Sequence, residues 1–226
     1  MSRIEFLGVS HHFGERPVLH EVDLDLVEHR VGVVGANGSG KSTLARMING
    51  LVTPSRGQVR VDGLDVAKHG REVRRTVGFV FTNPDNQIVM PTVAEDVAFT
   101  LRRRGLDKAD AAERVAHALE RFGLAQHADH PAHRLSGGQK QLLALAAVLV
   151  AEPAVVVADE PTTLLDARNA RHIGEMLHGM PQQVIVITHH LELLDGFDRV
   201  IVMEHGRIVA DDTPGAALGA YRSLLA

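Results

Sequence analysis

Glycines, a lysine and three hydroxyl residues lie together between a predicted buried strand and a predicted helix. Glycine lets successive backbone N–H groups turn toward one anion, and a helix that begins there adds partial positive charge. Lys41 would then hold the β- and γ-phosphates of a nucleotide, and the Ser42 hydroxyl would be a magnesium ligand. The flanking elements are the context that such a loop requires, so a chance glycine loop is the weaker interpretation. The predicted phosphate-binding loop consists of Gly35, Ala36, Asn37, Gly38, Ser39, Gly40, Lys41, Ser42 and Thr43.

Two acidic residues, Asp159 and Glu160, end a second apolar run at 155–158. A carboxylate at a strand end beside a phosphate loop can hold magnesium, directly or through water, and its neighbour can polarise the attacking water. We expect Asp159 to be the metal ligand and Glu160 the catalytic carboxylate. The alternative is a pair of acids that merely end a strand and face solvent, which is disfavoured in a chain that also carries a phosphate loop.

A third motif, Leu135-Ser136-Gly137-Gly138-Gln139, opens a predicted helix that runs through Val150. Ser136 and Gln139 have the spacing of a capping box. Two glycines directly after the cap cost helix propensity, roughly 1 kcal/mol each relative to alanine, and clear space for a ligand at the positive end of the helix dipole. The motif therefore predicts a second anion site rather than only a helix start.

The elements that must position these motifs follow from apolar periodicity and turn residues. Strands alternate with helices in the second half of the chain, which favours a parallel sheet. The expected strands are 4–9, 22–27, 31–34, 58–61, 76–81, 155–158 and 184–187, with a hairpin of 199–203 and 207–210. The expected helices are 42–49, one opened by Thr92 with Glu95 as its capping box, 108–122, the helix after Ser136, 166–180 and a last short helix.

Composition limits the class of protein. The chain has 226 residues, of which 45% are apolar, and this length suits one domain with a subdomain. Its net charge of −4 gives no basic field for nucleic acid, so we expect no nucleic-acid partner. Cysteine is absent, which rules out disulfides and fits a reducing compartment. The longest apolar run, 142–151, is about half of the roughly 20 residues that span a bilayer.

With these motifs the sequence resembles an ABC nucleotide-binding subunit over essentially its whole length. The resemblance implies an α/β fold: a P-loop NTPase (RecA-like) core with an N-terminal antiparallel β-subdomain and an inserted α-helical subdomain at about 84–152, in a single domain of 1–226. It implies that Ser136, Gly137, Gly138 and Gln139 contact the γ-phosphate bound on a partner's P-loop. Two subunits would therefore enclose two ATP molecules head to tail, and a homodimer is expected, although a heterodimer stays open.

The resemblance also assigns roles to three single residues. Phe13 falls where the family places an aromatic side chain that stacks on adenine; the alternative is an ordinary core or edge phenylalanine. His189, after the expected strand 184–187, matches the switch histidine that senses the γ-phosphate. Asp166, in Thr163-Leu164-Leu165-Asp166, matches the loop that couples the two ATP sites.

The segments 81–87 and 92–99 are similar to the ATPases of energy-coupling-factor importers, which take up vitamins and transition-metal ions in prokaryotes. Within these, residues 161–166 most resemble the biotin-uptake version, while cobalt and nickel relatives share much of the pattern. The partners implied are a transmembrane coupling protein and a substrate-binding membrane component, with the ATPase peripheral on the cytoplasmic face of the cell membrane. Two alternatives are a soluble ABC ATPase of DNA repair or translation and a small-molecule kinase, and the kinase is disfavoured because residues 135–139 would then have no role.

One position departs from the family pattern. The resemblance predicts a glutamine after the strand-end Phe81, where this chain has Thr82, and Gln87 lies five residues further on. Both are candidate nucleotide-site residues. Because a threonine side chain is shorter, we expect slower or differently coupled hydrolysis rather than an inactive site.

Two further clusters have simpler interpretations. His127, His130 and His133 could suggest a metal site, but Pro131 interrupts any helix there and the stretch is polar, so ligation is disfavoured. The arginine run 102–104 is interpreted as a solvated helix end.

Overall fold

The structure is a computed structural model that describes residues 1–102, 104–163 and 165–225. Arg103 of the arginine run and Leu164 of the predicted coupling loop lie outside the described residues. The chain forms two compact units. The first comprises Met1–Phe79, Ala154–Glu160 and Leu177–Ala226, and the second comprises Val80–Pro153 and Pro161–Met176.

The first unit contains an antiparallel sheet built from the N-terminal strands. Its order is β2-β1-β4-β5, and β1 pairs antiparallel with both β2 and β4. Buried and exposed residues alternate along β2, as expected for strands that cover a core on one face. The strands are β1 (Ile4–Phe13), β2 (Arg16–Leu26), β4 (Arg56–Val61) and β5 (Leu64–Asp65).

A second sheet has the order β10-β9-β3-β8-β7-β6. Strands β9, β3, β8 and β7 run parallel, while β10 closes one edge antiparallel to β9, which confirms the predicted parallel sheet and C-terminal hairpin. Every residue of β3, β7 and β8 is buried, as expected for central parallel strands. The strands are β3 (Arg30–Gly35), β6 (Val77–Val80), β7 (Val155–Asp159), β8 (Gln183–Ile187), β9 (Arg199–Glu204) and β10 (Arg207–Asp212).

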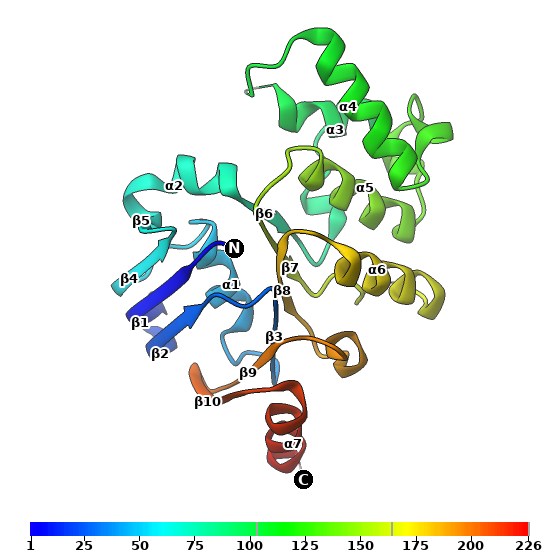
Figure 1. Ribbon diagram of the computed structural model, residues 1–226. Helices are drawn as coiled ribbons and strands as arrows, with labels where there is room; N and C mark the ends of the chain where they lie inside the picture. The colour runs from blue at the N-terminus through cyan, green and yellow to red at the C-terminus, as the bar shows by residue number, and fades with distance from the viewer. Residues whose placement is uncertain (103, 164, 226) are drawn as a thin grey trace. The chain divides into compact units, whose positions relative to one another are not determined.

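Helix α1 (Lys41–Ile48) contacts strands of both sheets, and α7 (Pro214–Leu225) contacts β9 and β10 (Figure 1). Helix α2 (Val66–Thr76) was missed by the sequence prediction. It buries only Val66 and Val73, contains Gly70, and has non-helical backbone angles at His69. With so few apolar residues and a glycine in its middle, the segment lacks the apolar content that identified the other helices from sequence.

The second unit is mainly helical, and α3, α4 and α5 pack on one another. Thr92 and Ser136 cap α3 and α5 with complete capping boxes, as predicted. Asp96 of α3 is only 3% exposed and accepts the N–H groups of Val89 and Met90 through Oδ1, at 2.8 and 3.0 Å. The helices are α3 (Val93–Leu101), α4 (Lys108–Arg121), α5 (Gly137–Leu149) and the start of α6 (Ala167–Gly179), with 3₁₀ turns η1 (Pro84–Asn86), η2 (Ala125–His127) and η3 (Ala132–Arg134); η4 (Leu191–Leu194) belongs to the first unit.

Among the described residues, no helix is both long enough and apolar enough to cross a bilayer. The same part of the chain contains no group of three or more His, Asp or Glu residues that could hold a metal ion.

Candidate functional site

The predicted phosphate loop connects β3 to α1 and requires glycine where its backbone turns. Gly40, directly before α1, has a φ of 100°, and Gly35 has a φ of 147°. A Cβ on Gly35 would lie 2.1 Å from the Met203 carbonyl oxygen, and one on Gly40 would lie 2.7 Å from a Leu19 methyl. The loop therefore has both an unusual backbone conformation and no room for side chains at these two positions.

Lys41 closes this loop. Its buried Nζ donates hydrogen bonds to the carbonyl oxygens of Gly35, at 2.7 Å, and Ala36, at 2.9 Å. An ammonium has three N–H donors, so one is left for a phosphate. Burial lowers the pKa of Lys41, and the charges of Glu160 and Asp159 act in the opposite direction.

Asp159 ends β7 next to the start of α1. The Ser42 hydroxyl donates to its Oδ1 at 2.8 Å, and Arg46 lies 3.8 Å from Oδ2. Asp159 is 1% exposed, and its Oδ2 accepts no hydrogen bond from the described residues. Burial raises the pKa of this carboxyl, Glu160 acts in the same direction, and Ser42, Arg46 and Lys41 oppose it.

The Ser42 and Asp159 oxygens test whether a magnesium ion fits here. A hydroxyl oxygen beside a buried carboxylate, one oxygen of which accepts no hydrogen bond from the described residues, is the kind of hard ligand set that Mg²⁺ prefers. Ser42 and Asp159 therefore fit the role predicted for them as ligands of a magnesium ion.

Glu160 follows Asp159 with a φ of 53°, an uncommon value for a residue other than glycine. Its N–H donates to the Ile187 carbonyl at 2.8 Å, which fixes this turn at the end of β8. Its carboxylate Oε2 lies 2.8 Å from Nδ1 of His189. Strained backbone of this kind is often found at functional sites, and here it places the predicted catalytic carboxylate in direct contact with the predicted switch histidine.

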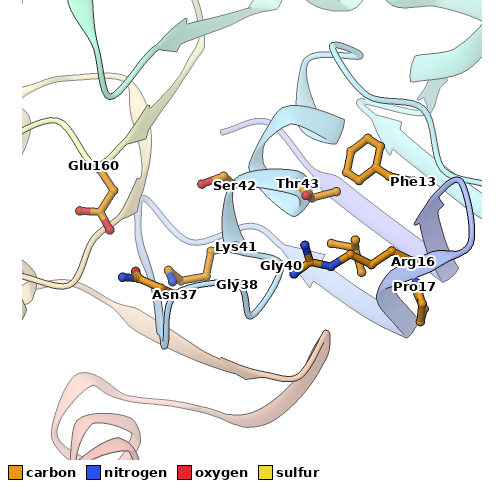
Figure 2. Close-up of a pocket in the computed structure, with 11 residues that line it drawn as sticks. Phe13, Arg16, Pro17, Asn37, Gly38, Gly40, Lys41, Ser42, Thr43 and Glu160 are labelled. Carbon is orange, nitrogen blue, oxygen red and sulfur yellow. The ribbon is translucent and has the colours of Figure 1, made fainter.

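A pocket of about 390 Å³ joins the loop to the β1–β2 turn (Figure 2). Figure 2 shows Phe13 and Arg16 at one end and Glu160 at the other. Phe13 is 55% exposed, which leaves its ring available to a ligand. The pocket is lined by Phe13, Arg16, Pro17, Val18, Asn37, Gly38, Gly40, Lys41, Ser42, Thr43 and Glu160.

Three predicted loop residues do not line the pocket. Gly35 and Ala36 serve as acceptors for Lys41, and Ser39 is buried with its carbonyl bonded to the Gly206 N–H. Conversely, the sequence analysis missed Arg16, Pro17 and Val18. The Arg16 backbone pairs with Phe13 across the β1–β2 turn, and its guanidinium forms no hydrogen bond or ion pair with any described residue.

The remaining predicted site residues belong to the second unit. Ser136 Oγ accepts the Gln139 N–H at 3.3 Å, and Gln139 Oε1 accepts the Ser136 N–H at 2.9 Å. A Cβ on Gly138 would lie 2.8 Å from the Asn169 amide, while Gly137 is exposed at the first position of α5. Asp166 accepts the Asn169 N–H at 2.8 Å just before α6.

Thr82 and Gln87 also lie in this unit. Gln87 uses both ends of its amide: Oε1 accepts the Phe81 N–H at 3.2 Å, and Nε2 donates to the Ala144 carbonyl at 2.9 Å. The loop after β6 is thereby bonded to the middle of α5. Thr82 is half-buried and forms no hydrogen bond with the described residues. The roles predicted for both residues at the nucleotide stay predictions.

The fold and the pocket define a P-loop nucleotide-binding protein of the α/β class. The chain belongs to the ABC transporter family, because the family model described as "ABC transporter" matches residues 19–163. This confirms the resemblance stated from the motifs, and with it the activity of an ATPase that binds ATP.

Several relatives are similar over almost the whole chain. A Deinococcus radiodurans protein with a generic ABC transporter ATP-binding name is 54% identical over 219 residues, 97% of each chain. "Biotin transport ATP-binding protein BioM" of Rhizobium etli is 46% identical over 224 residues, 99% of each chain. "Energy-coupling factor transporter ATP-binding protein EcfA1" of Caldanaerobacter subterraneus is 42% identical, covering 88% of this chain and 74% of the relative.

Two solved structures support the predicted fold class. CbiO1 of Clostridium perfringens, described as part of the ABC transporter complex cbiONQ, has a TM-score of 0.84 at 31% identity, covering 98% of this chain and 92% of that chain. The ATP-binding cassette MJ0796, described as a post-hydrolysis dimer bound to ADP and Pi, has a TM-score of 0.82 at 28% identity, covering 93% and 98%. The predicted α/β ABC ATPase fold is confirmed.

Proposed function

We propose that this chain is the ATP-hydrolysing subunit of a prokaryotic energy-coupling-factor importer and that the transported solute is biotin. The names of the Rhizobium etli and Caldanaerobacter subterraneus relatives support the two parts of this proposal. The 54% identical relative has no solute in its name, and a 41% identical relative from Syntrophus aciditrophicus is named "Cobalt import ATP-binding protein CbiO", so a metal-ion importer is the second candidate. The whole chain acts as one nucleotide-binding domain, with the helical part inserted at about 84–152.

The observation that carries the proposed chemistry is the gathering of Lys41, Ser42 and Glu160 on one pocket, with Asp159 bonded to Ser42. The loop N–H groups and the free Lys41 donor bind the phosphates. The Phe13 ring stacks on the base. Glu160 accepts a hydrogen bond from a water molecule and aligns it with the γ-phosphorus, and His189 holds the Glu160 carboxylate.

Ser42 and Asp159 would hold Mg²⁺, which when bound offsets phosphate charge. The pocket supplies cations and a base, and a γ-phosphate bound there needs hydrogen-bond donors on its outer side as well. We propose that Ser136, Gly137, Gly138 and Gln139 of a second copy supply them, with Asp166 coupling the two sites. A lone subunit should therefore hydrolyse ATP slowly.

The proposed partners are a transmembrane coupling protein and a substrate-binding membrane component, which would place the chain on the cytoplasmic face of the cell membrane. The proposed site for the coupling protein is the segment 82–99. In that segment Val89 and Phe99 expose large apolar side chains, 62% and 46%.

A carboxylate substitution tests the chemistry. Glu160→Gln should bind ATP, lose hydrolysis and accumulate an ATP-dependent dimer, measured by size exclusion with light scattering. Glu192→Gln is the matched control, because Glu192 is exposed and does not line the pocket. A Glu160→Gln variant that turns over ATP at the native rate would show that Glu160 is misassigned.

Uptake measurements test the solute. The chain is purified with the membrane proteins that accompany it, reconstituted in vesicles with ATP, and supplied with labelled biotin, cobalt or nickel in separate experiments. Biotin uptake that Glu160→Gln abolishes is the expected result. Uptake of cobalt or nickel without biotin would contradict the biotin assignment, and recovery with ribosomes or DNA instead of membrane proteins would contradict the importer.

A further inference from the structure

A chain of hydrogen bonds connects two histidines to the last residue of the glycine motif at the start of α5. His127 Nε2 lies 3.0 Å from the amide nitrogen of Gln139, and His127 Nδ1 lies 2.9 Å from Nδ1 of His130. The two rings meet at 60° with centroids 4.9 Å apart. These contacts lie within the second unit, and the proposed nucleotide chemistry does not use the histidines.

The capping box determines the orientation of the Gln139 amide. The Ser136 backbone N–H is a donor, so the atom 2.9 Å away from it must be the Gln139 carbonyl oxygen. The NH₂ group of Gln139 then faces His127 Nε2, which must accept. A reversed amide would place two donors against each other at Ser136, so the amide assignment follows from the backbone.

The same logic determines where both histidines carry their protons. Because His127 Nε2 accepts from Gln139, the ring proton of neutral His127 is on Nδ1. That Nδ1–H donates to His130 Nδ1, which must have a free lone pair, so the proton of His130 is on Nε2. Both rings are neutral, and no other arrangement satisfies all three hydrogen bonds.

Backbone bonds hold the His127 segment in place. The carbonyl oxygens of Ala128 and His130 accept the N–H groups of Ala94 and Val93 at the start of α3, at 2.9 and 3.2 Å. The Ala132 N–H donates to the Pro91 carbonyl at 2.9 Å. His127 therefore acts from a support that is fixed independently of Gln139.

A metal bridge is the competing explanation for two adjacent histidines. Two nitrogens on a tetrahedral zinc ion, each about 2.0–2.1 Å from it, are roughly 3.3 Å apart, and the 2.9 Å here is a hydrogen-bond distance. No third ligand from the described His, Asp or Glu residues joins them. His127 Nε2 is already occupied by Gln139.

We propose that His127, held by His130, is a positioning residue that keeps the Gln139 amide in its capping geometry and so keeps Ser136 and Gly137 ordered for the ATP of a second subunit. This inference rests on the proposed role of residues 136–139. Within it, His127 and His130 serve the α5 motif rather than a metal ion.

The first test measures the ring protons directly. Histidine ¹⁵N–¹H correlation spectra of the full-length chain should show His127 as the Nδ1–H form and His130 as the Nε2–H form. An Nε2–H form of His127 would overturn the proposal. This measurement needs no variant, so it does not depend on how a substitution affects folding.

The second test compares side chains that place an acceptor differently. Gln carries its oxygen about as far from the backbone as His Nε2, whereas Asn reaches only the distance of Nδ1. His127→Gln should retain kcat, while His127→Asn and His127→Ala should lower it roughly 2- to 10-fold, the factor that one net hydrogen bond represents. The Kd of the isolated subunit for ATP should not change, because the pocket has no residue from this segment.

His133→Ala is the matched control, since His133 is an exposed histidine of the same segment and has no hydrogen bond to the described residues. Equal kcat values for all His127 variants, or equal losses for Gln and Asn, would refute the positioning role. A wild-type chain without ATPase activity would refute the proposed function instead, and the ring-proton measurement would still decide the His127–Gln139 contact.

Discussion

The contact between Glu160 and His189 allows the roles of the two side chains to be separated by a double-mutant cycle. If Glu160 aligns the attacking water, Glu160→Gln should lower kcat by roughly 10²- to 10⁴-fold, or about 2.7–5.4 kcal/mol. His189 Nδ1 lies 2.8 Å from Oε2 of that carboxylate. A hydrogen bond to a charged group is worth about 1.5–3 kcal/mol, and the lower end applies because the His189 side chain is 48% exposed.

His189→Ala should therefore lower kcat about 10-fold when Glu160 is present. If His189 acts only by holding the carboxylate, the same change should cost less than about 2-fold once Glu160 has been replaced by Gln, because residues that act as one unit are not additive. Single-turnover hydrolysis of radiolabelled ATP measures both backgrounds. His117→Ala, an exposed histidine of α4, is the control.

An equal loss in both backgrounds would refute this reasoning. It would mean that His189 acts on the γ-phosphate without Glu160, as the family resemblance implies. The cycle thus distinguishes the contact seen in the structure from the role expected from the motif.

Three further predictions concern the pocket, the loop after β6 and the second unit. Arg16→Gln should weaken ATP and ADP binding alike, roughly 3- to 10-fold by calorimetry, because its guanidinium lines the pocket and has no hydrogen bond or ion pair with the described residues. The exposed Arg71, changed to Gln, is the control and should leave both affinities unchanged. Thr82→Gln should raise the ATPase rate of the purified subunit, and an unchanged or lower rate would contradict the hypothesis that Thr82 slows hydrolysis. Asp96→Ala should lower the free energy of unfolding in urea by roughly 1–3 kcal/mol, because it removes the acceptor of two part-buried backbone N–H groups, whereas Asp96→Asn keeps an acceptor. Burial raises the pKa of Asp96, and its two hydrogen bonds oppose this shift. The folded state therefore binds a proton more tightly than the unfolded state does, and the wild-type protein should lose stability as pH rises through the raised pKa. Over that pH range the Asp96→Asn variant should gain stability relative to the wild type.

The phosphate loop could be predicted from sequence because its determinants are local. The glycines, Lys41 and Ser42 are adjacent in the chain, and the backbone angles they need are those that glycine allows. The capping boxes at Thr92 and Ser136 were predicted for the same reason, since each joins residues only three positions apart.

Contacts between segments far apart in the chain were harder to predict from the sequence. The Ser42–Asp159 bond joins residues 117 positions apart, and it could be anticipated only because strand ends of a parallel sheet meet at one edge. No comparable pattern in the sequence indicated that Arg16 lines the pocket. Its place in the pocket depends on the register of the β1–β2 turn, where it pairs with Phe13, and on the packing of Gly40 against Leu19.

Because of the Gln87 bonds, the attachment of the loop 81–87 to α5 and the effect of Thr82 on hydrolysis can be tested separately. Gln87 connects the Phe81 N–H to α5, and Lys140 of the same helix donates to Asp85 at 2.7 Å. Two side-chain links therefore fasten the loop 81–87 to the helix that begins at the glycine motif, and neither uses residue 82. A substitution at Thr82 leaves both links intact, so its effect on hydrolysis reports on that side chain alone. Gln87→Ala, in contrast, should loosen the loop from α5 whatever residue occupies position 82.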